Sequence, residues 1–378
     1  MFGSTHLRRD TVVAILVIED SSASITLMSK DSGRVIVYDR AQALAEPQLE
    51  GTESASTATL IHEVGTRVMD AYSKTGMRAP VTSAYCIVHE PYARTRVRRA
   101  VKSFEEDTRI SSDIVKELFR SACAEELEAD PEGILEAGVL AVELNGYATD
   151  HPVGQYAHTA ELFAISSDIN SELKKAIGTA LWSLWPAAYI SWRSGIRSIL
   201  SVERVLQHKR EYVAVVVGPG CTSIYGIDNG SLYASHTVRE GLRTILARAG
   251  GSRNPMETAS YFRMIARDAC EDDTCAAILG SLGAAEPDLV RVFGDAFSAL
   301  STGRKLPNDI VLVADADLGT WLTRFFGRID FSQFTATTLP FNVEQISAKQ
   351  LSTVIECPDT LSPVLALGAA HARIELRR

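Results

Sequence analysis

Several features that would place this chain in a specialised class of protein are scarce or absent from its sequence. Its 378 residues include only six cysteines, and these form neither a CxxC pair nor the regular spacing of a disulfide framework, which favours a reducing cytoplasm. No apolar run approaches the ~20 residues that a membrane-spanning helix requires. The apolar segment after Arg9 continues into a hairpin pattern instead of a cleavage site, so we expect neither a secretory leader nor direct membrane insertion.

Positive charge is also in short supply. The chain has 38 Lys and Arg against 47 Asp and Glu, a net charge of −9, and the basic residues are scattered, which disfavours a nucleic-acid-binding face. No HExxH motif and no Ser–His–acid set can be picked out. Cys270 and Cys275 flank three acidic residues but have no His nearby, so an acidic helix end is favoured over a metal site.

The composition is that of a globular protein, with 46% hydrophobic and 22% charged residues, in a chain long enough for two or three domains. Its most informative pattern is a strand, a short loop of small polar residues, a second strand, a tight turn and a third strand. The pattern occurs at 11–38 and again at 212–235, with the loops at 19–23 and 218–222. Small residues let backbone N–H groups converge on an anion, so two facing loops would hold a polyphosphate between two lobes.

Helices and further strands surround these two copies. Between the first helix and the second copy, residues 84–166 form a separate unit that we interpret as a small α+β insertion. The expected strands lie at 84–88, 138–144, 160–166, 187–191 and 309–313. The expected helices lie at 58–72, 113–126, 170–184, 194–206, 238–249, 255–270, 287–300, 319–326 and 362–372.

This order of elements resembles the actin-like ATPase superfamily, which includes actin, Hsp70 and the sugar kinases. The inserted unit, with the helix ISSDIVKELFRSA after a basic strand, is similar to the branch that holds the bacterial cell-division protein FtsA and the type IV pilus assembly protein PilM. The resemblance implies an α/β, actin-like (ribonuclease H-like) fold of two duplicated lobes with a small inserted α+β domain. The implied ranges are 1–83 and 167–206 for the first lobe, 84–166 for the inserted domain, 207–361 for the second lobe with a helical part at about 250–305, and 362–378 for a closing helix that returns to the first lobe.

Compared with the nucleotide motifs of this superfamily, the first phosphate loop is partly retained. Where the family has Asp-x-Gly-Thr/Ser, this chain has Glu19 at the acid, Ser21 at the glycine and Ser22 at the hydroxyl position. Glu19 has two interpretations, a metal ligand or a turn-facing residue at the end of a buried strand, and the second is favoured.

The second phosphate loop, Asp-x-Gly-Gly-Gly-Thr-Thr-Asp in the family, departs further. The replaced positions are Val216, Pro219, Cys221 and Ser223, and the retained ones are Gly218, Gly220 and Thr222. Valine binds no magnesium, and proline removes one backbone N–H from the cradle. The retained glycines serve either phosphate binding or backbone geometry alone, and backbone geometry is favoured.

The adenosine-side loop is glycine-rich in the family, but here it reads Ala-Asp-Ala-Asp at 314–317, before Gly319. Asp315 would place a carboxylate where the fold seats a nucleotide, a repulsion on the order of several kcal/mol unless a metal or Arg neutralises it. We therefore expect no ATP hydrolysis, and binding of ATP with magnesium that is absent or weak. The vestigial cleft comprises Glu19, Ser21, Ser22, Gly218, Gly220, Thr222, Asp315 and Gly319.

Two groups outside the cleft also have two interpretations each. Trp182, Trp185, Trp192 and Tyr189 form either core packing between helix and sheet or a ligand site, and packing is favoured. The basic run from Arg94 to Lys102 is either a solvated sheet face or a contact for an acidic partner, and the solvated face is favoured.

The preferred function is a cytoplasmic, actin-like scaffold or adaptor that has lost its ATPase and binds protein partners. It is expected to be closer to PilM than to FtsA, because FtsA-like proteins commonly end in an amphipathic helix and this sequence ends without one. The resemblance implies that a short cytoplasmic peptide of an inner-membrane pilus or division protein docks against the inserted domain and the first lobe. The strands at 84–88 and 138–144 are the two candidate edges on which we expect this peptide to add by β-augmentation. The alternative is an active, ATP-hydrolysing FtsA-like division protein that polymerises, and self-association through the lobes stays open.

Overall fold

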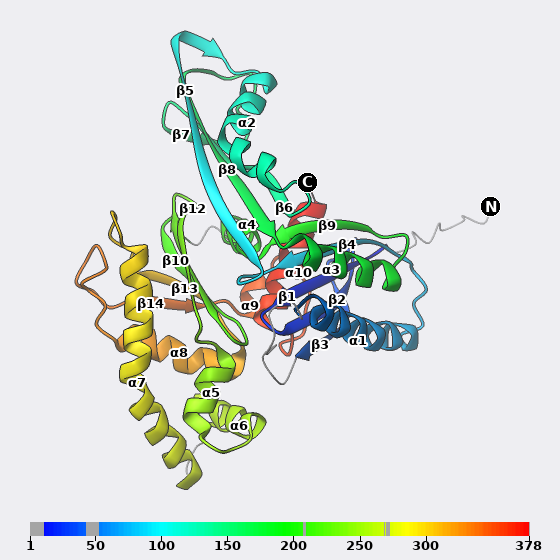
Figure 1. Ribbon diagram of the computed structural model, residues 1–378, viewed down its shortest axis with the longest axis vertical. Helices are drawn as coiled ribbons and strands as arrows, with labels where there is room; N and C mark the ends of the chain where they lie inside the picture. Colours follow the sequence, from blue (N-terminus) through cyan, green and yellow to red (C-terminus); the bar gives the residue numbers. More distant parts are fainter. Residues whose placement is uncertain (1–10, 43–52, 207–208, 268, 270–272, 378) are drawn as a thin grey trace, which may run out of the picture.

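The computed structural model describes residues 11–42, 53–206, 209–267, 269 and 273–377, and it shows two lobes with a projecting domain (Figure 1). The sheet of the first lobe has the strand order β3-β2-β1-β4-β9. Its strands are β1 (Val12–Glu19), β2 (Ser22–Ser29), β3 (Val35–Gln42), β4 (Val81–Val88) and β9 (Tyr189–Ser194). The β1, β2 and β3 strands are antiparallel neighbours, whereas β4 runs parallel to both β1 and β9.

The sheet of the second lobe repeats this plan with the order β12-β11-β10-β13-β14. Its strands are β10 (Tyr212–Val217), β11 (Thr222–Asp228), β12 (Ser231–Val238), β13 (Asp309–Val313) and β14 (Asn342–Gln345). Each neighbouring pair has the same relative direction as its counterpart in the first lobe. The predicted duplication is therefore confirmed, although β14, a partly exposed strand of four residues, has no apolar run that would have revealed it.

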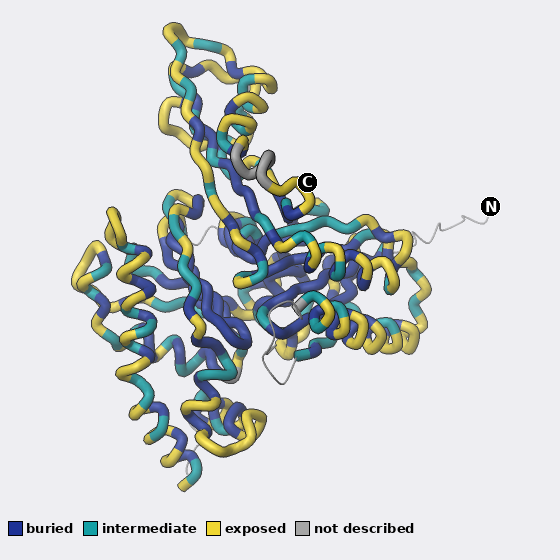
Figure 2. Tube along the Cα trace, viewed as in Figure 1, coloured by how far each residue is buried: buried dark blue, intermediate teal, exposed yellow. Residues whose placement is uncertain are grey.

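The strands that open each copy are buried on both faces, which accounts for their unbroken apolar sequences. In β1, Val13, Ile15 and Val17 pack into a core shared by both lobes, while the alternate residues pack under the outer helices of the first lobe. In β10, Ala214 and Val216 face the shared core and the intervening valines face the second lobe's own core. Figure 2 shows buried residues continuing from one lobe into the other.

Two helices, α4 (Gly195–Leu206) and α10 (Pro363–Leu376), pack against each other in the shared core. Small residues let α10 approach the first sheet closely, since a Cβ on Gly368 would lie 2.9 Å from Ile87 Cδ1. Helices α1 (Glu53–Lys74) and α3 (Ser171–Leu184) cover the outer face of that sheet (Figure 1). The second lobe carries α5 (Leu242–Gly250), α6 (Pro255–Ala266), α7 (Asp273–Leu300) and α8 (Ala316–Arg328), and α9 (Ala348–Leu351) leads to α10.

Helix α7 is longer than the sequence predicts. The helix predicted at 287–300 begins at Pro287, and proline favours the first turn of a helix. The proline instead lies inside a helix of 28 residues. Cys275, Ile278 and Leu282 extend the buried face of the later turns to the other side of Pro287, so packing outweighs the local preference.

The inserted domain is an antiparallel sheet of order β5-β8-β6-β7 with the helix α2 (Ser112–Ala129) packed on one face. Its strands are β5 (Ala93–Arg109), β6 (Ile134–Leu144), β7 (Tyr147–Thr149) and β8 (Tyr156–Ile169). Ser111 caps α2, and its side chain accepts a hydrogen bond from Ile114 N. The strand expected to open this domain, at 84–88, is instead part of β4, in the interior of the first lobe's sheet, because its apolar residues are buried on both faces. The other domain bounds stay predictions.

The aromatic residues expected to form one packed cluster do not do so. Trp185 is buried, but Trp182 is 57% exposed and Tyr189 is 74% exposed. Lys174 Nζ lies 5.8 Å from the ring centre of Trp192. Packing therefore explains Trp185 and leaves two large aromatic side chains at the surface of the first lobe.

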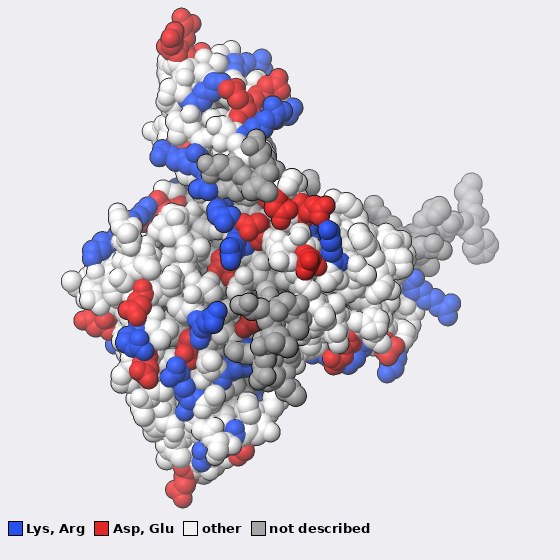
Figure 3. Space-filling model, in the orientation of Figure 1, with Lys and Arg blue, Asp and Glu red and all other residues white. Residues whose placement is uncertain are grey.

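The basic run lies in β5, at one edge of the inserted domain's sheet. Three of its cations, Arg96, Arg99 and Lys102, form ion pairs within the domain, with Asp168, Glu161 and Glu117 respectively. Figure 3 shows Lys and Arg intermixed with Asp and Glu over the visible face of the molecule. The run therefore does not form a basic patch without counter-charges.

The described cysteines depart from the expectation of thiols alone. Cys275 is disulfide-bonded, whereas Cys86, Cys123, Cys221 and Cys357 are free, and Cys270 lies outside the described residues. Among the helices that the structure describes, none is long and apolar enough to cross a membrane. The described residues also contain no cluster of three or more His, Cys, Asp or Glu side chains suited to a metal ion.

Candidate functional site between the lobes

The two predicted loops meet at the boundary between the lobes. β1 ends at Glu19 and β10 ends at Val217, so 19–22 and 218–221 both follow the carboxyl end of a central strand, the usual position of ligand sites in open α/β sheets. A Cβ on Gly218 would lie 3.5 Å from Glu19 Oε1, and one on Gly220 would collide with the Asp20 carboxylate. The loops face each other as predicted, and acidic side chains of the first lie against the backbone of the second.

Arg40, near the end of β3, is the first of two cations at this boundary. Its Nη1 donates a hydrogen bond to Asp315 Oδ2 of the second lobe at 2.8 Å, and its Nη2 lies 3.5 Å from Glu19 Oε2. Asp315 occupies the N-cap position of α8 but makes no side-chain bond to that helix. Arg40 therefore joins the acid of the first phosphate loop to the acid of the adenosine-side loop.

Arg243, in the first turn of α5, is the second cation. Its Nη2 lies 3.4 Å from Asp20 Oδ2 of the first lobe, and both side chains are 21% exposed. Near this pair, burial raises the pKa of the Cys221 thiol to about 12, with Asp20 adding to the effect and Arg243 opposing it. The thiol is therefore neutral at physiological pH and no thiolate forms in the loop.

The charges between the loops do not balance. Three carboxyl groups meet two guanidinium groups there: Glu19, Asp20 and Asp315 against Arg40 and Arg243. Glu19 is the most buried of the acids, at 5% exposed. Burial raises its pKa to about 7, Arg40 opposes the rise, and Asp315 and Asp20 add to it. A proton on Glu19 thus compensates for the missing third cation near neutral pH.

The second loop uses its backbone groups within its own lobe. Gly218 N donates to Cys221 O at 2.9 Å, and the carbonyls of Gly218 and Pro219 accept from Leu242 N and Arg243 N at 2.9 and 2.8 Å. Helix N-termini bind anions through such first-turn donors, and here two of them are bonded to the loop itself. These backbone groups of the loop are therefore engaged in bonds within the second lobe.

The predicted hydroxyl residues are engaged as well. Ser22 Oγ donates to Glu19 Oε2 at 3.4 Å, and Ser21 Oγ donates to Asp20 Oδ1 at 3.2 Å. Ser21 has a positive φ of 58°, in the position where the family has glycine. The Thr222 hydroxyl donates to the carbonyl of Glu240 at 2.6 Å and is fully buried.

On the adenosine side, a glutamine fills the space beside Gly319. A Cβ on Gly319 would collide with the side-chain amide of Gln345, whose Nε2 donates to Ala314 O at 3.3 Å. The close approach that this glycine permits is thus used by Gln345. Of the eight predicted residues, those in contacts between the lobes are Glu19, Gly218, Gly220 and Asp315. Ser21 and Ser22 bond acids of their own loop, and Thr222 and Gly319 contact residues of the second lobe.

Sequence reasoning missed the two arginines. Arg40 follows an ordinary strand pattern and Arg243 opens an ordinary helix, so neither belongs to a motif. The partners of these arginines lie 275 and 223 residues away in the chain. The only available signal was the surplus of acids in loops that normally meet a polyphosphate, which requires neutralising cations from elsewhere.

A second buried polar group joins the inserted domain to the first lobe. Glu136, on β6, accepts from Ser194 N at 2.9 Å and from the Ser194 hydroxyl, and its Oε2 lies 3.4 Å from Arg197 Nε. Burial raises the pKa of Glu136, and Arg197 opposes the rise. Arg197 and Arg193 also pair with Glu375 of α10, so this group links three elements at the base of the domain.

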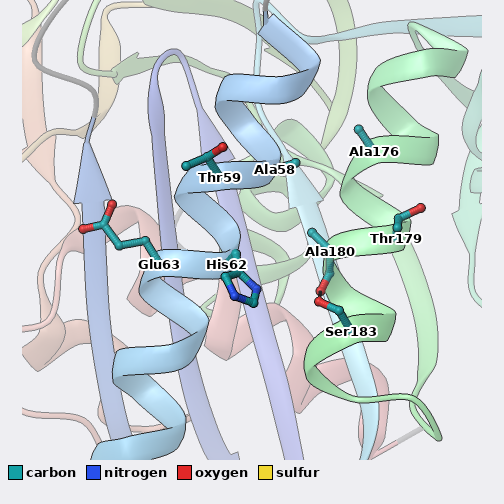
Figure 4. A pocket seen from close by; sticks show the side chains of 8 residues that line it. All are labelled: Ala58, Thr59, His62, Glu63, Ala176, Thr179, Ala180 and Ser183. Carbon is teal, nitrogen blue, oxygen red and sulfur yellow. Dashed lines mark hydrogen bonds between the residues drawn. The ribbon is translucent and has the colours of Figure 1, made fainter.

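A groove of about 670 Å³ lies between α1 and α3 on the outer face of the first lobe (Figure 4). Its lining residues are small or polar: Ala58, Thr59, His62, Glu63, Ala176, Thr179, Ala180 and Ser183. No buried cation or unpaired carboxylate is among them. The groove therefore has room for a ligand but few side chains that would bind one specifically.

No family model matches the chain, and no curated protein matches it in sequence. Its structure is similar to the PilM–PilN type IV pilus biogenesis complex, with a TM-score of 0.58 and 14% identity over 97% of this chain and 99% of that chain. Similarity extends at a TM-score of 0.46 to the ethanolamine utilization protein EutJ from Carboxydothermus hydrogenoformans, with 9% identity over 95% of this chain and 90% of that chain. The cytoplasmic domain of EpsL, an inner-membrane component of the Vibrio cholerae type II secretion system, matches at 0.35, with 9% identity over 96% and 94%. The chain has an actin-like ATPase fold and resembles PilM in structure.

Proposed function

We propose that this chain is a PilM-like, actin-like scaffold that binds a short cytoplasmic segment of a membrane protein and does not hydrolyse ATP. The observation that carries the proposal is the content of the interlobe boundary. Arg40 and Arg243 neutralise acids of the opposite lobe there, in the positions that the fold family uses for a metal-bound triphosphate. The protein works in the cytoplasm, at the inner face of the membrane, where its partner recruits it.

The residues present do not fit magnesium and a triphosphate. Val216 lies where a metal-binding acid is needed, and the Asp315 carboxylate is aimed at Arg40. A polyphosphate would have to displace two partly buried arginine–carboxylate pairs and would lie beside the Asp20 and Asp315 carboxylates, which costs several kcal/mol by order of magnitude. No catalytic step is therefore assigned to this boundary.

The partner segment is proposed to dock beside β6. Of the two strands considered from the sequence, the one at 84–88 is excluded because β1 and β9 flank it. On the side of β6 opposite β8, β7 pairs only with Val142–Leu144, and no other strand in the described part of the chain pairs with 134–141 there. Lys174 Nζ donates to the carbonyl of Glu132 at 3.0 Å and to that of Ile134, so the open edge begins after Ile134.

Side chains near this edge suit an extended, partly apolar peptide. Val139 of β6 is 40% exposed, and Leu140 beside it is partly buried. An added strand would gain main-chain hydrogen bonds from the β6 edge, with alternate side chains packed on these apolar groups. The printed name of the similar complex, PilM–PilN, supports a protein partner of this kind.

Two measurements test the proposal. Affinity capture from detergent-solubilised membranes should recover a defined membrane protein with the wild-type chain, and Val139→Glu should abolish its recovery. Val101→Glu is the matched control, because Val101 is 53% exposed on β5 of the same domain. If both variants lose recovery of the membrane protein equally, or if neither loses it, the proposed docking edge on β6 is rejected.

Phosphate release decides between this proposal and the alternative function. A scaffold without ATPase activity should release no phosphate above the buffer rate, in the presence or absence of its partner. Release that depends on magnesium and disappears in Glu19→Ala would instead establish the FtsA-like, ATP-hydrolysing alternative.

A further inference from the structure

The two ion pairs between the lobes are reciprocal. Arg40 belongs to the first lobe and its partner Asp315 to the second, whereas Arg243 belongs to the second lobe and its partner Asp20 to the first. Each lobe therefore supplies one cation and one anion to the other. Separation of the lobes would break both pairs together.

We propose that Arg40–Asp315 and Arg243–Asp20 form a latch that holds the two lobes in one closed orientation through the chain's own charges. The inference rests on the proposed function, in which no nucleotide bridges the lobes. In this account, the guanidinium groups replace the metal-bound phosphates as the link between the two lobes.

The position of the latch in the fold determines which motion of the lobes it opposes. The lobes are joined through the shared core around α4 and α10, which contains residues of both sheets. The ion pairs lie outside that core, at the carboxyl ends of the central strands. A rotation about the shared core that separates the loops would therefore break the latch, together with the contacts of Glu90 with Thr237 and Cys221.

The burial of the latch makes it stronger than a surface ion pair but still reversible. The four side chains are between 21% and 26% exposed, so their charges interact through a lower effective dielectric constant and are less screened by salt than exposed pairs. Arg40 Nε and Arg243 Nη1 are buried without a hydrogen-bond partner. Opening would hydrate these atoms and so offset part of the lost attraction.

The decisive experiment measures the distance between the lobes in the full-length chain. Spin labels are placed on Thr66→Cys of α1 and Ser260→Cys of α6, two exposed positions in different lobes, in a Cys357→Ser background. The labelled protein with both ion pairs intact should give one narrow distribution of distances between the two labels. Arg243→Asp, which sets two acids against each other, should shift most of the population to longer distances.

A charge swap supplies the rescue. The double variant Asp20→Arg with Arg243→Asp restores an opposite pair and should return the distribution to that of the wild type. Arg248→Gln is the matched control, since Arg248 lies on the same helix but pairs with Glu240 of its own lobe at 3.1 and 2.9 Å. This variant should leave the interlobe distance unchanged.

An unchanged distance in Arg243→Asp, or a longer distance that the swap does not reverse, would overturn the latch. If Arg243→Asp fails to fold, Arg243→Gln is measured instead, with a partial shift expected and no shift contradicting the proposal. ATP titration of the unlabelled wild type separates the two ideas, because nucleotide binding would reject the proposed function whereas only the distances judge the latch.

Discussion

The Arg40 guanidinium hydrogen-bonds the Asp315 carboxylate across the boundary between the lobes, at 2.8 Å. In the proposed function, this contact takes the place of a nucleotide as a link between the lobes. It also explains how an acid is tolerated in the adenosine-side loop, because Asp315 has a cation beside it.

Glu19→Gln should change how stability depends on pH. Burial raises the Glu19 pKa from 4.5 to about 7, so the folded state binds a proton that the unfolded state has released between these values. The free energy of unfolding contributed by Glu19 is present below pH 4.5 and is lost as pH rises through about 7, a total of about 3 kcal/mol. Urea unfolding at pH 5, 6, 7 and 8 measures the free energy of unfolding of the wild type and of the variant. As pH rises, the variant should become more stable relative to the wild type.

His89 acts in the opposite direction and must be separated from this effect. Burial lowers its pKa to about 4, so its contribution to stability is present above pH 6.5 and is lost as pH falls through 4. Both proteins contain His89, so its contribution cancels in their difference. A difference that stays flat from pH 5 to pH 8 would contradict the assignment to Glu19.

Gly241→Ala should destabilise the second loop. A Cβ there would lie 2.6 Å from Cys221 N and 2.7 Å from Gly218 O, and backbone atoms cannot move aside as a flexible side chain can. We expect a loss of roughly 2–3 kcal/mol in the free energy of unfolding. Gly280→Ala is the control, since nothing lies within 4 Å of its Cβ position in α7, and it should stabilise the helix by about 0.5–1 kcal/mol. Equal effects of the two substitutions would disprove the packing argument.

Glu136→Ala should weaken the junction between the inserted domain and the first lobe. The substitution leaves Ser194 N and Arg197 without their buried acceptor, and we expect a loss of roughly 2–3 kcal/mol. Glu132→Ala is the matched control, because the Glu132–Lys175 pair is 68% exposed on both sides and surface pairs contribute about 0–1 kcal/mol. Thermal unfolding of the two variants compares them directly, and a larger loss in Glu132→Ala would contradict this account.

The duplicated sheets could be predicted because their central strands are apolar from Val12 to Ile18 and from Tyr212 to Val217. β1 and β10 are buried on both faces, and the small residues after each strand mark the loops. The same apolar character led to the wrong placement of the strand at 84–88, because a buried strand has the same sequence pattern whichever sheet contains it. The start of α7 was wrongly predicted at Pro287 for a similar reason, because the local preference of proline carries no information about the packing that overrides it.

The contents of the cleft were only partly predictable. The losses at Val216 and Pro219 are visible in the sequence, since both positions belong to a motif. The replacements, Arg40 and Arg243, are not visible, because their pairings depend on two loops brought together by the fold. Gln345 filling the space at Gly319 was equally hidden, because it comes from a strand that the sequence did not predict.

The most direct test of the central claim is calorimetric titration of the wild-type chain with ATP and magnesium at low ionic strength. We expect no saturable heat up to millimolar nucleotide, because arginine–carboxylate pairs of the chain itself link the two lobes. A micromolar dissociation constant with a stoichiometry near one would contradict the account.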